Sequence, residues 1–161
     1  MSQASQTSNT PATAFLPEAK AGSQSPNQQY SNHPILLFDG VCNLCNASVQ
    51  WILKHDQQGQ FRFAALQSEV GQHFLQKHGL AAKDFDTAVL VIGEQIFLRS
   101  DAALEIVRRL GGFWRLLYFF KILPRPLRNA VYNLVARNRY RWFGHREECM
   151  LPTPAWKERF L

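Results

Sequence analysis

The feature that most constrains the fold is a pair of cysteines placed between an apolar run and an amphipathic segment. The run Ile35–Phe38 ends at an Asp-Gly pair, which predicts a buried strand that enters a turn. Cys42 and Cys45 follow at once, and the helical spacing of the next apolar residues predicts a helix over residues 42–55. Its apolar face is expected to consist of Leu44, Ala47, Ser48, Trp51 and Ile52.

Further elements follow along the chain. Residues 61–66 carry alternating aromatic side chains and predict a second strand, and Ser68 is expected to cap a short helix. Residues 88–92 and 95–99 flank a Gly-Glu pair, which predicts a β-hairpin with a type II′ turn. Ser100, with the Asp after it, is expected to cap a last helix that ends at a Gly-Gly pair. The apolar face of that helix is expected to consist of Ala103, Leu104, Val107 and Leu110.

The order of these elements is strand, helix, strand, helix, strand, strand, helix. Two strands joined through a helix are expected to lie parallel, whereas the strands of a hairpin are antiparallel. The simplest closure is an α/β domain with a four-stranded mixed sheet and helices on both faces. This is the thioredoxin-like, or glutaredoxin-like, plan.

Three segments are expected along the chain. Residues 1–33 are rich in Ser, Gln, Asn, Ala, Pro and Thr and are expected to form a disordered leader without the features of a secretory signal. Residues 34–112 would form the core, and residues 113–161 a helical extension packed on it. Within the extension, the aromatic residues 113–123 are expected to be helical and part of the core. The next helix would pack on the domain through Leu127, Ala130, Val131, Leu134 and Val135.

Two thiols at the start of a helix suit dithiol–disulfide exchange. Thiolate is the attacking species, and the amides and dipole of a helix start favour a negative charge on Cys42. One turn later, Cys45 is close enough to attack a mixed disulfide and release the substrate. We expect Cys42 to be the nucleophile, exposed at the helix start, and Cys45 to be the resolving thiol. The partners would be protein or small-molecule thiols and disulfides, with neither a metal nor an organic cofactor.

Asp39 stands three residues before Cys42 and is open to two interpretations. As a charged neighbour it would raise the pKa of the thiols, and when protonated or linked through water it could carry a proton to or from Cys45. An Asp that forms a turn before Gly, however, requires no chemistry. We count Asp39 among the candidate catalytic residues.

The residues around the cysteines resemble a known family. The run from Phe38 to Cys45 is similar to the signature of the DCC family of predicted thiol-disulfide oxidoreductases, whose name records its Asp and two Cys. The resemblance continues in Arg99–Ala103, Leu123-Pro124 and Asn138–Gly144, and at Cys149 with Pro152. It covers roughly residues 34–161. It implies a thioredoxin-like fold and a reaction class more firmly than a substrate.

The chain departs from thioredoxin opposite the cysteines. Thioredoxins and glutaredoxins place a cis-proline before the third strand, where this chain has Thr87 and Ala88. A cis bond before a residue other than proline costs about 2.5–4 kcal/mol, so a trans peptide is expected. The backbone of Thr87 and Ala88 is the expected substrate-binding segment.

A zinc site is the competing hypothesis. Cys42, Cys45, His145 and Cys149 form a Cys₃His set with acceptable local spacing, which would make the protein a zinc-stabilised interaction module with a basic surface. Such a site needs the four residues to converge, whereas exchange needs Cys42 to be exposed. Cys149 is otherwise a small buried residue or a third redox partner.

The positive charge lies mostly in the C-terminal half. The net charge is +6, and the segment from Arg99 to Arg146 holds eleven Lys and Arg against only two acidic residues, Asp101 and Glu105. A basic surface is expected there, without a recognisable nucleic-acid fold. Peripheral membrane contact through residues 113–123 is the less favoured interpretation of that segment. The scarcity of cysteine and the absence of a signal favour the cytoplasm, and the sequence does not indicate an oligomeric state.

Overall fold

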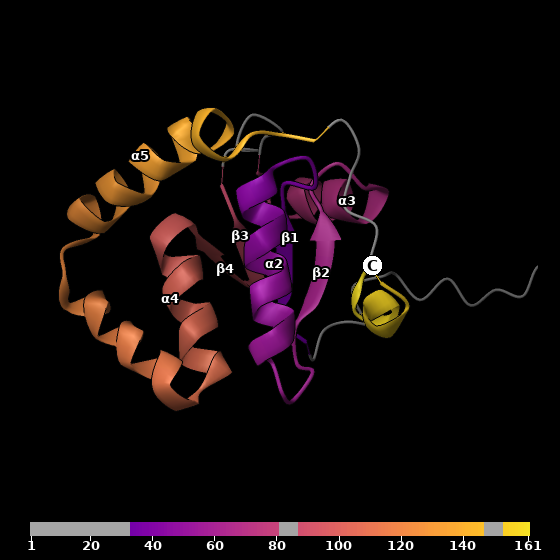
Figure 1. Ribbon diagram of the computed structural model, residues 1–161, viewed down its shortest axis with the longest axis horizontal. Helices are drawn as coiled ribbons and strands as arrows, with labels where there is room; N and C mark the ends of the chain where they lie inside the picture. Colours follow the sequence, from indigo (N-terminus) through magenta and orange to yellow (C-terminus); the bar gives the residue numbers. More distant parts are fainter. Residues whose placement is uncertain (1–32, 81–86, 147–152) are drawn as a thin grey trace, which may run out of the picture.

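The computed structural model describes residues 33–80, 87–146 and 153–161, and Figure 1 shows how their elements are arranged. The strands are β1 (Ile35–Phe38), β2 (Arg62–Ala65), β3 (Val89–Ile92) and β4 (Gln95–Leu98). The helices are α2 (Asn43–His55), α3 (Glu69–Lys77), α4 (Arg99–Leu110) and α5 (Arg125–Phe143), with 3₁₀ helices η2 (Gly112–Ile122) and η3 (Pro154–Arg159). The leader expected over residues 1–33 lies, apart from His33, outside the described residues.

The strands form a mixed sheet in the order β2-β1-β3-β4. β1 pairs in parallel with β2, as expected for two strands joined through a helix, and antiparallel with β3. β3 and β4 form the predicted hairpin, and Gly93 at its turn has a φ of 59°, which suits the first position of a type II′ turn. The prediction of a thioredoxin-like, four-stranded mixed sheet is confirmed.

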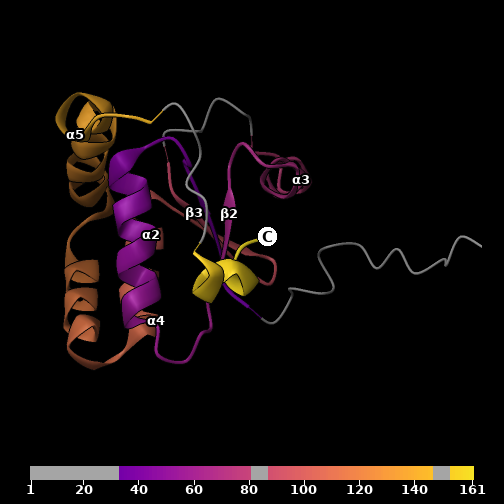
Figure 2. The same ribbon diagram turned by 45° about the vertical axis from the view of Figure 1, so that its right-hand side comes forward.

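Helices cover both faces of this sheet (Figure 2). Leu36 and Phe38 of β1 belong to the core under α2 and α4, whereas Ile35 and Leu37 belong to the core under α3. Successive side chains of a strand point to opposite faces, and β1 is buried throughout, so this one strand contributes to both cores. Its end therefore delivers Asp39 and the cysteines to the interior of the domain.

The two predicted helix caps have different outcomes. Ser68 caps α3, because its Oγ accepts a hydrogen bond from the backbone N–H of Gly71 at 3.1 Å. The expected cap at Ser100 is wrong, because β4 passes directly into α4, which begins at Arg99. The hydroxyl of Ser100 instead binds Oδ1 of Asn129 on α5 at 2.6 Å.

The expectation that residues 113–123 belong to the core is wrong. No side chain of η2 is buried, and Phe113 and Ile122 are 74% and 71% exposed. α2 and α4 already cover this face of the sheet, so η2 packs beside α4 on the outside of the domain. Trp114 is half-buried and meets Trp51 of α2 edge to face, with ring centroids 4.7 Å apart.

Helix α5 contacts α2 and α4 mostly through a different side from the one predicted, although Val135 of the predicted side is half-buried. Three large residues of the predicted packing face, Leu127, Val131 and Leu134, are more than half exposed. The side that faces the domain carries Arg128, Tyr132 and Arg139, which bind Asp101, Ala88 and Asp39 respectively. Burying such groups costs free energy unless they are paired, so these polar partners determine the rotation of the helix. Among the described residues, none of the helices is long and apolar enough to cross a bilayer.

Candidate functional site

Helix α2 begins where the sequence predicts. Cys42 is its N-cap, with extended backbone, and its Sγ accepts a hydrogen bond from the backbone N–H of Cys45 at 3.2 Å. The carbonyl oxygen of Cys42 accepts the first helical hydrogen bond, from Asn46, at 3.0 Å. Amides at a helix start and the helix dipole both favour negative charge at this position. The sulfur of Cys42 therefore lies at the start of the helix, within hydrogen-bond distance of a backbone N–H.

Cys42 has no exposed surface, so the expectation that it is exposed at the helix start is wrong. The backbone of His145 pairs with that of Cys42 in an isolated antiparallel bridge, and the N–H of Arg146 donates to the carbonyl oxygen of Val41 at 2.7 Å. The side-chain amide of Asn43 also holds this segment by donating to the last carbonyl oxygen of α5 at 2.9 Å. The chain that follows α5 thus lies directly against the first cysteine.

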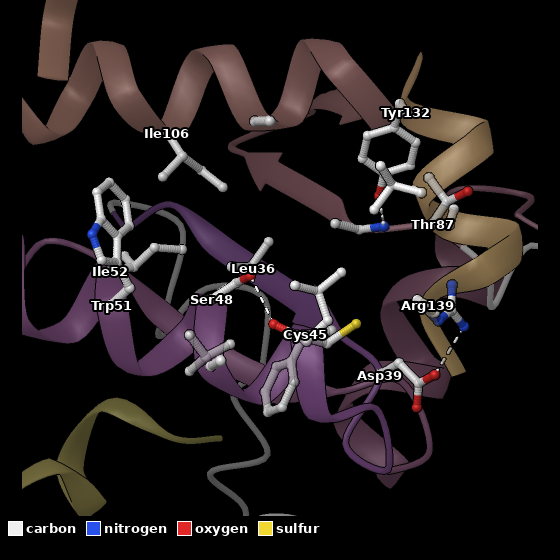
Figure 3. A pocket seen from close by; sticks show the side chains of 18 of the residues that line it. Leu36, Asp39, Cys45, Ser48, Trp51, Ile52, Thr87, Ile106, Tyr132 and Arg139 are labelled. Atoms are coloured by element: carbon white, nitrogen blue, oxygen red, sulfur yellow. Dashed lines mark hydrogen bonds and ion pairs between the residues drawn. The ribbon is translucent and has the colours of Figure 1, made fainter. Parts of the chain in front are cut away.

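Cys45 is half-buried and lines a cavity of about 560 Å³. Figure 3 shows its side chain at the end of the cavity where Asp39, Thr87 and Arg139 lie, with Trp51 at the other end. Cys42 does not line this cavity. A molecule in the cavity would therefore meet the sulfur of the second cysteine and not that of the first.

The walls of the cavity are mostly apolar. From α2 it is lined by Leu44, Ala47, Ser48, Val49, Trp51 and Ile52, and from α4 by Ala103, Ile106 and Val107. Val135 and Ala136 of α5 lie across from them. The face of α2 that the sequence predicts to be apolar, and part of that of α4, thus lines a space as well as contributing to the core. Cavities of roughly 300–1,000 Å³ with apolar walls and a few polar groups are typical small-molecule sites.

Asp39 lies at the polar end of the cavity and is bound through both carboxylate oxygens. Oδ2 accepts from Nη2 of Arg139 at 2.9 Å and from the hydroxyl of Tyr140. Oδ1 accepts from Nε2 of Gln67 at 2.9 Å and from the backbone N–H of Val41 at 3.2 Å. Both members of the Asp39–Arg139 ion pair are buried. Asp39 thus supports the turn and also holds a buried guanidinium beside the cysteines.

The thiols differ in electrostatic environment. Burial raises the pKa of Cys45 far above its usual range, the hydrogen bond with Cys42 and its charge raise it further, and the charge of Arg139 opposes these effects. Burial also raises the pKa of Tyr132, and burial together with the hydrogen bond to Asp39 raises that of Tyr140. Near neutral pH, Cys45 therefore keeps its proton and both phenols are neutral.

Thr87 and Ala88, the expected substrate-binding segment, line the same cavity. The backbone N–H of Ala88 is already engaged, because it donates to the hydroxyl of Tyr132 on α5 at 2.9 Å. Helix α5 thus occupies a backbone donor that the sequence-based interpretation assigned to the substrate.

Sequence reasoning missed the partners that α5 brings to the site. Arg139 was counted with the basic surface, yet its side chain is only 4% exposed. Tyr140 and Tyr132 were likewise given no role. The available signal was the resemblance itself, because the family-like run Asn138–Gly144 contains both Arg139 and Tyr140. Their contact with Asp39 joins residues about a hundred positions apart, and no local pattern reveals it.

The described residues include three of the four proposed zinc ligands. Cys149 lies outside the described residues, so the proposed four-residue set stays a prediction. Within the described ranges, no group of three or more His, Cys, Asp or Glu side chains is placed to hold a metal ion. His145 meets Cys42 through a backbone bridge.

A thioredoxin-like sheet with a Cys-x-x-Cys pair at the start of its first helix defines a class of thiol-bearing proteins. Comparison with known families is more specific: the chain belongs to the DCC1-like thiol-disulfide oxidoreductase family, whose model matches residues 36–145. The resemblance drawn from the run Phe38 to Cys45 is thereby confirmed.

Two relatives carry the similarity beyond the motif. The chain is 50% identical over 127 residues to the uncharacterized protein YuxK of Bacillus subtilis (strain 168), an alignment that covers 79% of this chain and 93% of YuxK. It is 41% identical over 119 residues to a chloroplastic DCC family protein of Arabidopsis thaliana, over 73% of this chain and 69% of that protein. No solved structure matches the chain.

Proposed function

We propose that the protein catalyses dithiol–disulfide exchange through Cys42 and Cys45, on a substrate that enters the cavity beside Cys45. One observation carries this proposal: the backbone N–H of Cys45 donates to Sγ of Cys42, while the Cys45 side chain lines the cavity. The helix start thus supports a thiolate on one sulfur, and the cavity gives access to the other.

The roles of the two cysteines follow from which of their sulfur atoms a substrate can reach. With the pair oxidised, a substrate thiolate attacks Sγ of Cys45, the Cys42–Cys45 bond breaks, and Cys42 leaves as a thiolate. The amides and dipole of the helix start favour the negative charge that develops on the leaving sulfur of Cys42. A second substrate thiol, once deprotonated, attacks the substrate sulfur of the mixed disulfide. The products are one substrate disulfide and the reduced pair, with a proton on Cys45.

The reverse sequence reduces a substrate disulfide. Cys45 first loses its proton, and its thiolate attacks that disulfide; one substrate sulfur leaves as a thiolate and takes up a proton, and a mixed disulfide forms on Cys45. The Cys42 thiolate then attacks Sγ of Cys45, and the second substrate sulfur leaves as a thiolate. In this order Cys45 reacts with the substrate first, and Cys42 is the internal nucleophile that resolves the mixed disulfide.

Asp39 enters this scheme as a positioning residue. Burial raises the pKa of Cys45; the charge of Arg139, which Asp39 binds, lowers that pKa, and the charge of Asp39 itself raises it. Holding the guanidinium at the polar end of the cavity would make the Cys45 thiolate easier to form when exchange requires it. A proton relay through Asp39 is the alternative role.

The cavity favours a compact apolar thiol or disulfide over an extended polypeptide. Its walls are largely apolar, and the Asp39–Arg139 pair satisfies the charges at its polar end. Ala88 donates its N–H to Tyr132, so this donor is not free to pair with a substrate strand. Thr87 and Ala88 would contact such a substrate as parts of the cavity wall.

A redox titration of the full chain tests the exchange itself. The protein is purified anaerobically, its zinc is quantified, and it is equilibrated against graded glutathione buffers before alkylation and mass analysis. We expect a reversible two-electron transition that peptide mapping assigns to Cys42 and Cys45, and that persists in a Cys149→Ser variant. Thiols that stay reduced at every ratio, or stoichiometric zinc that protects them, would refute the proposal.

A further inference from the structure

Helix η2 and the outer side of α5 both carry large exposed apolar side chains, and these are here together called the apolar–basic face. Its large apolar side chains include Phe113, Leu116, Phe119 and Ile122 of η2, and Val131 and Leu134 of α5. All six are between 58% and 74% exposed. Exposed apolar surface of this kind marks an interaction site more often than an ordinary solvent face.

The two elements lie together on one side of the molecule. Figure 1 shows η2 and α5 running along the left edge, and Figure 2 keeps them on the side remote from α3. The opposite side of α5 is already bound to the domain through Arg128, Tyr132 and Arg139. The apolar–basic face is therefore the side of these helices that the domain leaves uncovered.

The charged residues in the part of the chain that contains η2 and α5 are all basic. Residues 106–146 contain ten Lys and Arg and no Asp or Glu, and five of the ten form ion pairs with acidic residues: Arg108, Arg109, Arg125, Arg128 and Arg139. The acidic residues that precede it are engaged, Asp101 with Arg125 and Arg128, and Glu105 with arginines of α4. Arg115 and Lys121 are exposed among the aromatic and aliphatic side chains of η2. The partner of this face should therefore offer negative charge next to an apolar phase.

We propose that the apolar–basic face docks on the surface of an anionic phospholipid bilayer. Aromatic and aliphatic side chains would enter the boundary between headgroups and acyl chains, while Lys and Arg would contact the lipid phosphates. Trp142 and Tyr118 lie in the same elements, and such rings favour the membrane interface.

Two other occupants fit the face less well. A second copy of the chain would set cations against cations, which opposes self-association through this surface. A nucleic acid would pair with the cations, but it would leave Leu116, Ile122 and Leu134 without an apolar environment. An anionic bilayer satisfies both kinds of group at once.

Vesicle flotation of the full chain tests this proposal. We expect it to float with vesicles that contain phosphatidylglycerol, far more weakly with pure phosphatidylcholine, and less as ionic strength rises. An Arg115→Gln/Lys121→Gln variant should bind roughly 25-fold more weakly, at about fivefold for each charge near the surface. The matched control, Lys54→Gln/Lys77→Gln, removes two exposed charges from α2 and α3 and should bind like the parent.

A second variant separates the apolar contribution. Phe119→Ser/Ile122→Ser changes two side chains that are 70% and 71% exposed, so the fold should be retained, as a thermal melt verifies. Its flotation should fall sharply even at low salt. The proposal is overturned if the parent does not float, or if the Phe119→Ser/Ile122→Ser variant floats like the parent. Light scattering that shows a dimer abolished by the same substitutions would also overturn it, as would binding to DNA at a salt concentration where vesicles are not bound.

Discussion

Asp39 and Arg139 are a hundred residues apart in the chain and form a buried ion pair, with Oδ2 and Nη2 at 2.9 Å. The pair joins the turn before the cysteines to the last turns of α5. It therefore fixes the extension to the end of the domain that carries the two cysteines and places a cation near Cys45.

Replacement of Arg139 tests the energetic importance of this pair. Arg139→Met keeps much of the side-chain volume but leaves the carboxylate of Asp39 buried without its cation. Breaking a buried pair in this way costs about 3–5 kcal/mol, so the free energy of unfolding should fall by that amount. Denaturant unfolding measures it. Arg137→Met, on the exposed side of the same helix, should change stability by no more than about 0.5 kcal/mol.

Single-cysteine variants distinguish the two orders of attack. If the substrate meets Cys45, then Cys42→Ser should accumulate a mixed disulfide with an aromatic disulfide such as 4,4′-dithiodipyridine, because no internal thiolate remains to resolve it. Cys45→Ser should trap little, because Cys42 has no exposed surface. Intact mass after a timed quench provides the readout. Trapping that occurs mainly on Cys42 in the Cys45→Ser variant would restore the order expected from the sequence.

The pH dependence of alkylation at Cys45 follows from its raised pKa. Alkylation tracks the thiolate fraction, so a raised pKa moves the profile of Cys45 to higher pH than that of an unfolded peptide with the same sequence. In Cys42→Ser the hydrogen bond and charge of Cys42 are lost, and the profile should move to lower pH. Burial remains, so it should stay above that of the unfolded peptide. Iodoacetamide labelling followed by peptide mapping measures each profile, and identical profiles for parent and variant would contradict the coupling.

Filling the cavity should slow the reaction with a substrate without changing the redox equilibrium of the cysteine pair. Ala136→Phe adds a ring to the α5 wall and should slow exchange with 4,4′-dithiodipyridine at least tenfold, while the glutathione titration of the pair changes little. Ala130→Phe, on the exposed side of α5, is the matched control.

Charge on the substrate provides a further check of the cavity. Parent protein should react faster with the neutral 4,4′-dithiodipyridine than with the dianionic 5,5′-dithiobis(2-nitrobenzoate), each rate scaled to that of a free cysteine peptide. The walls are apolar and the guanidinium of Arg139 is already paired. A faster scaled rate with the dianion would contradict the proposal that the substrate is apolar.

The sequence by itself determined the sheet and the position of the thiols. The apolar run Ile35–Phe38 and the hairpin around Gly93 became strands, and Cys42 began a helix, because these signals are local and depend on residues a few positions apart. The capping preference of Ser68 is local in the same way.

Only the tertiary structure decided the exposure of the thiols and the surroundings of Asp39. Burial of Cys42 depends on the backbone of His145, and the ion pair of Asp39 on Arg139, both about a hundred residues away in the chain. The rotation of α5 was decided in the same way. Its apolar residues predict one packing side, but buried polar groups need partners, and those partners lie on other elements of the domain. The apolar stripe was therefore left exposed.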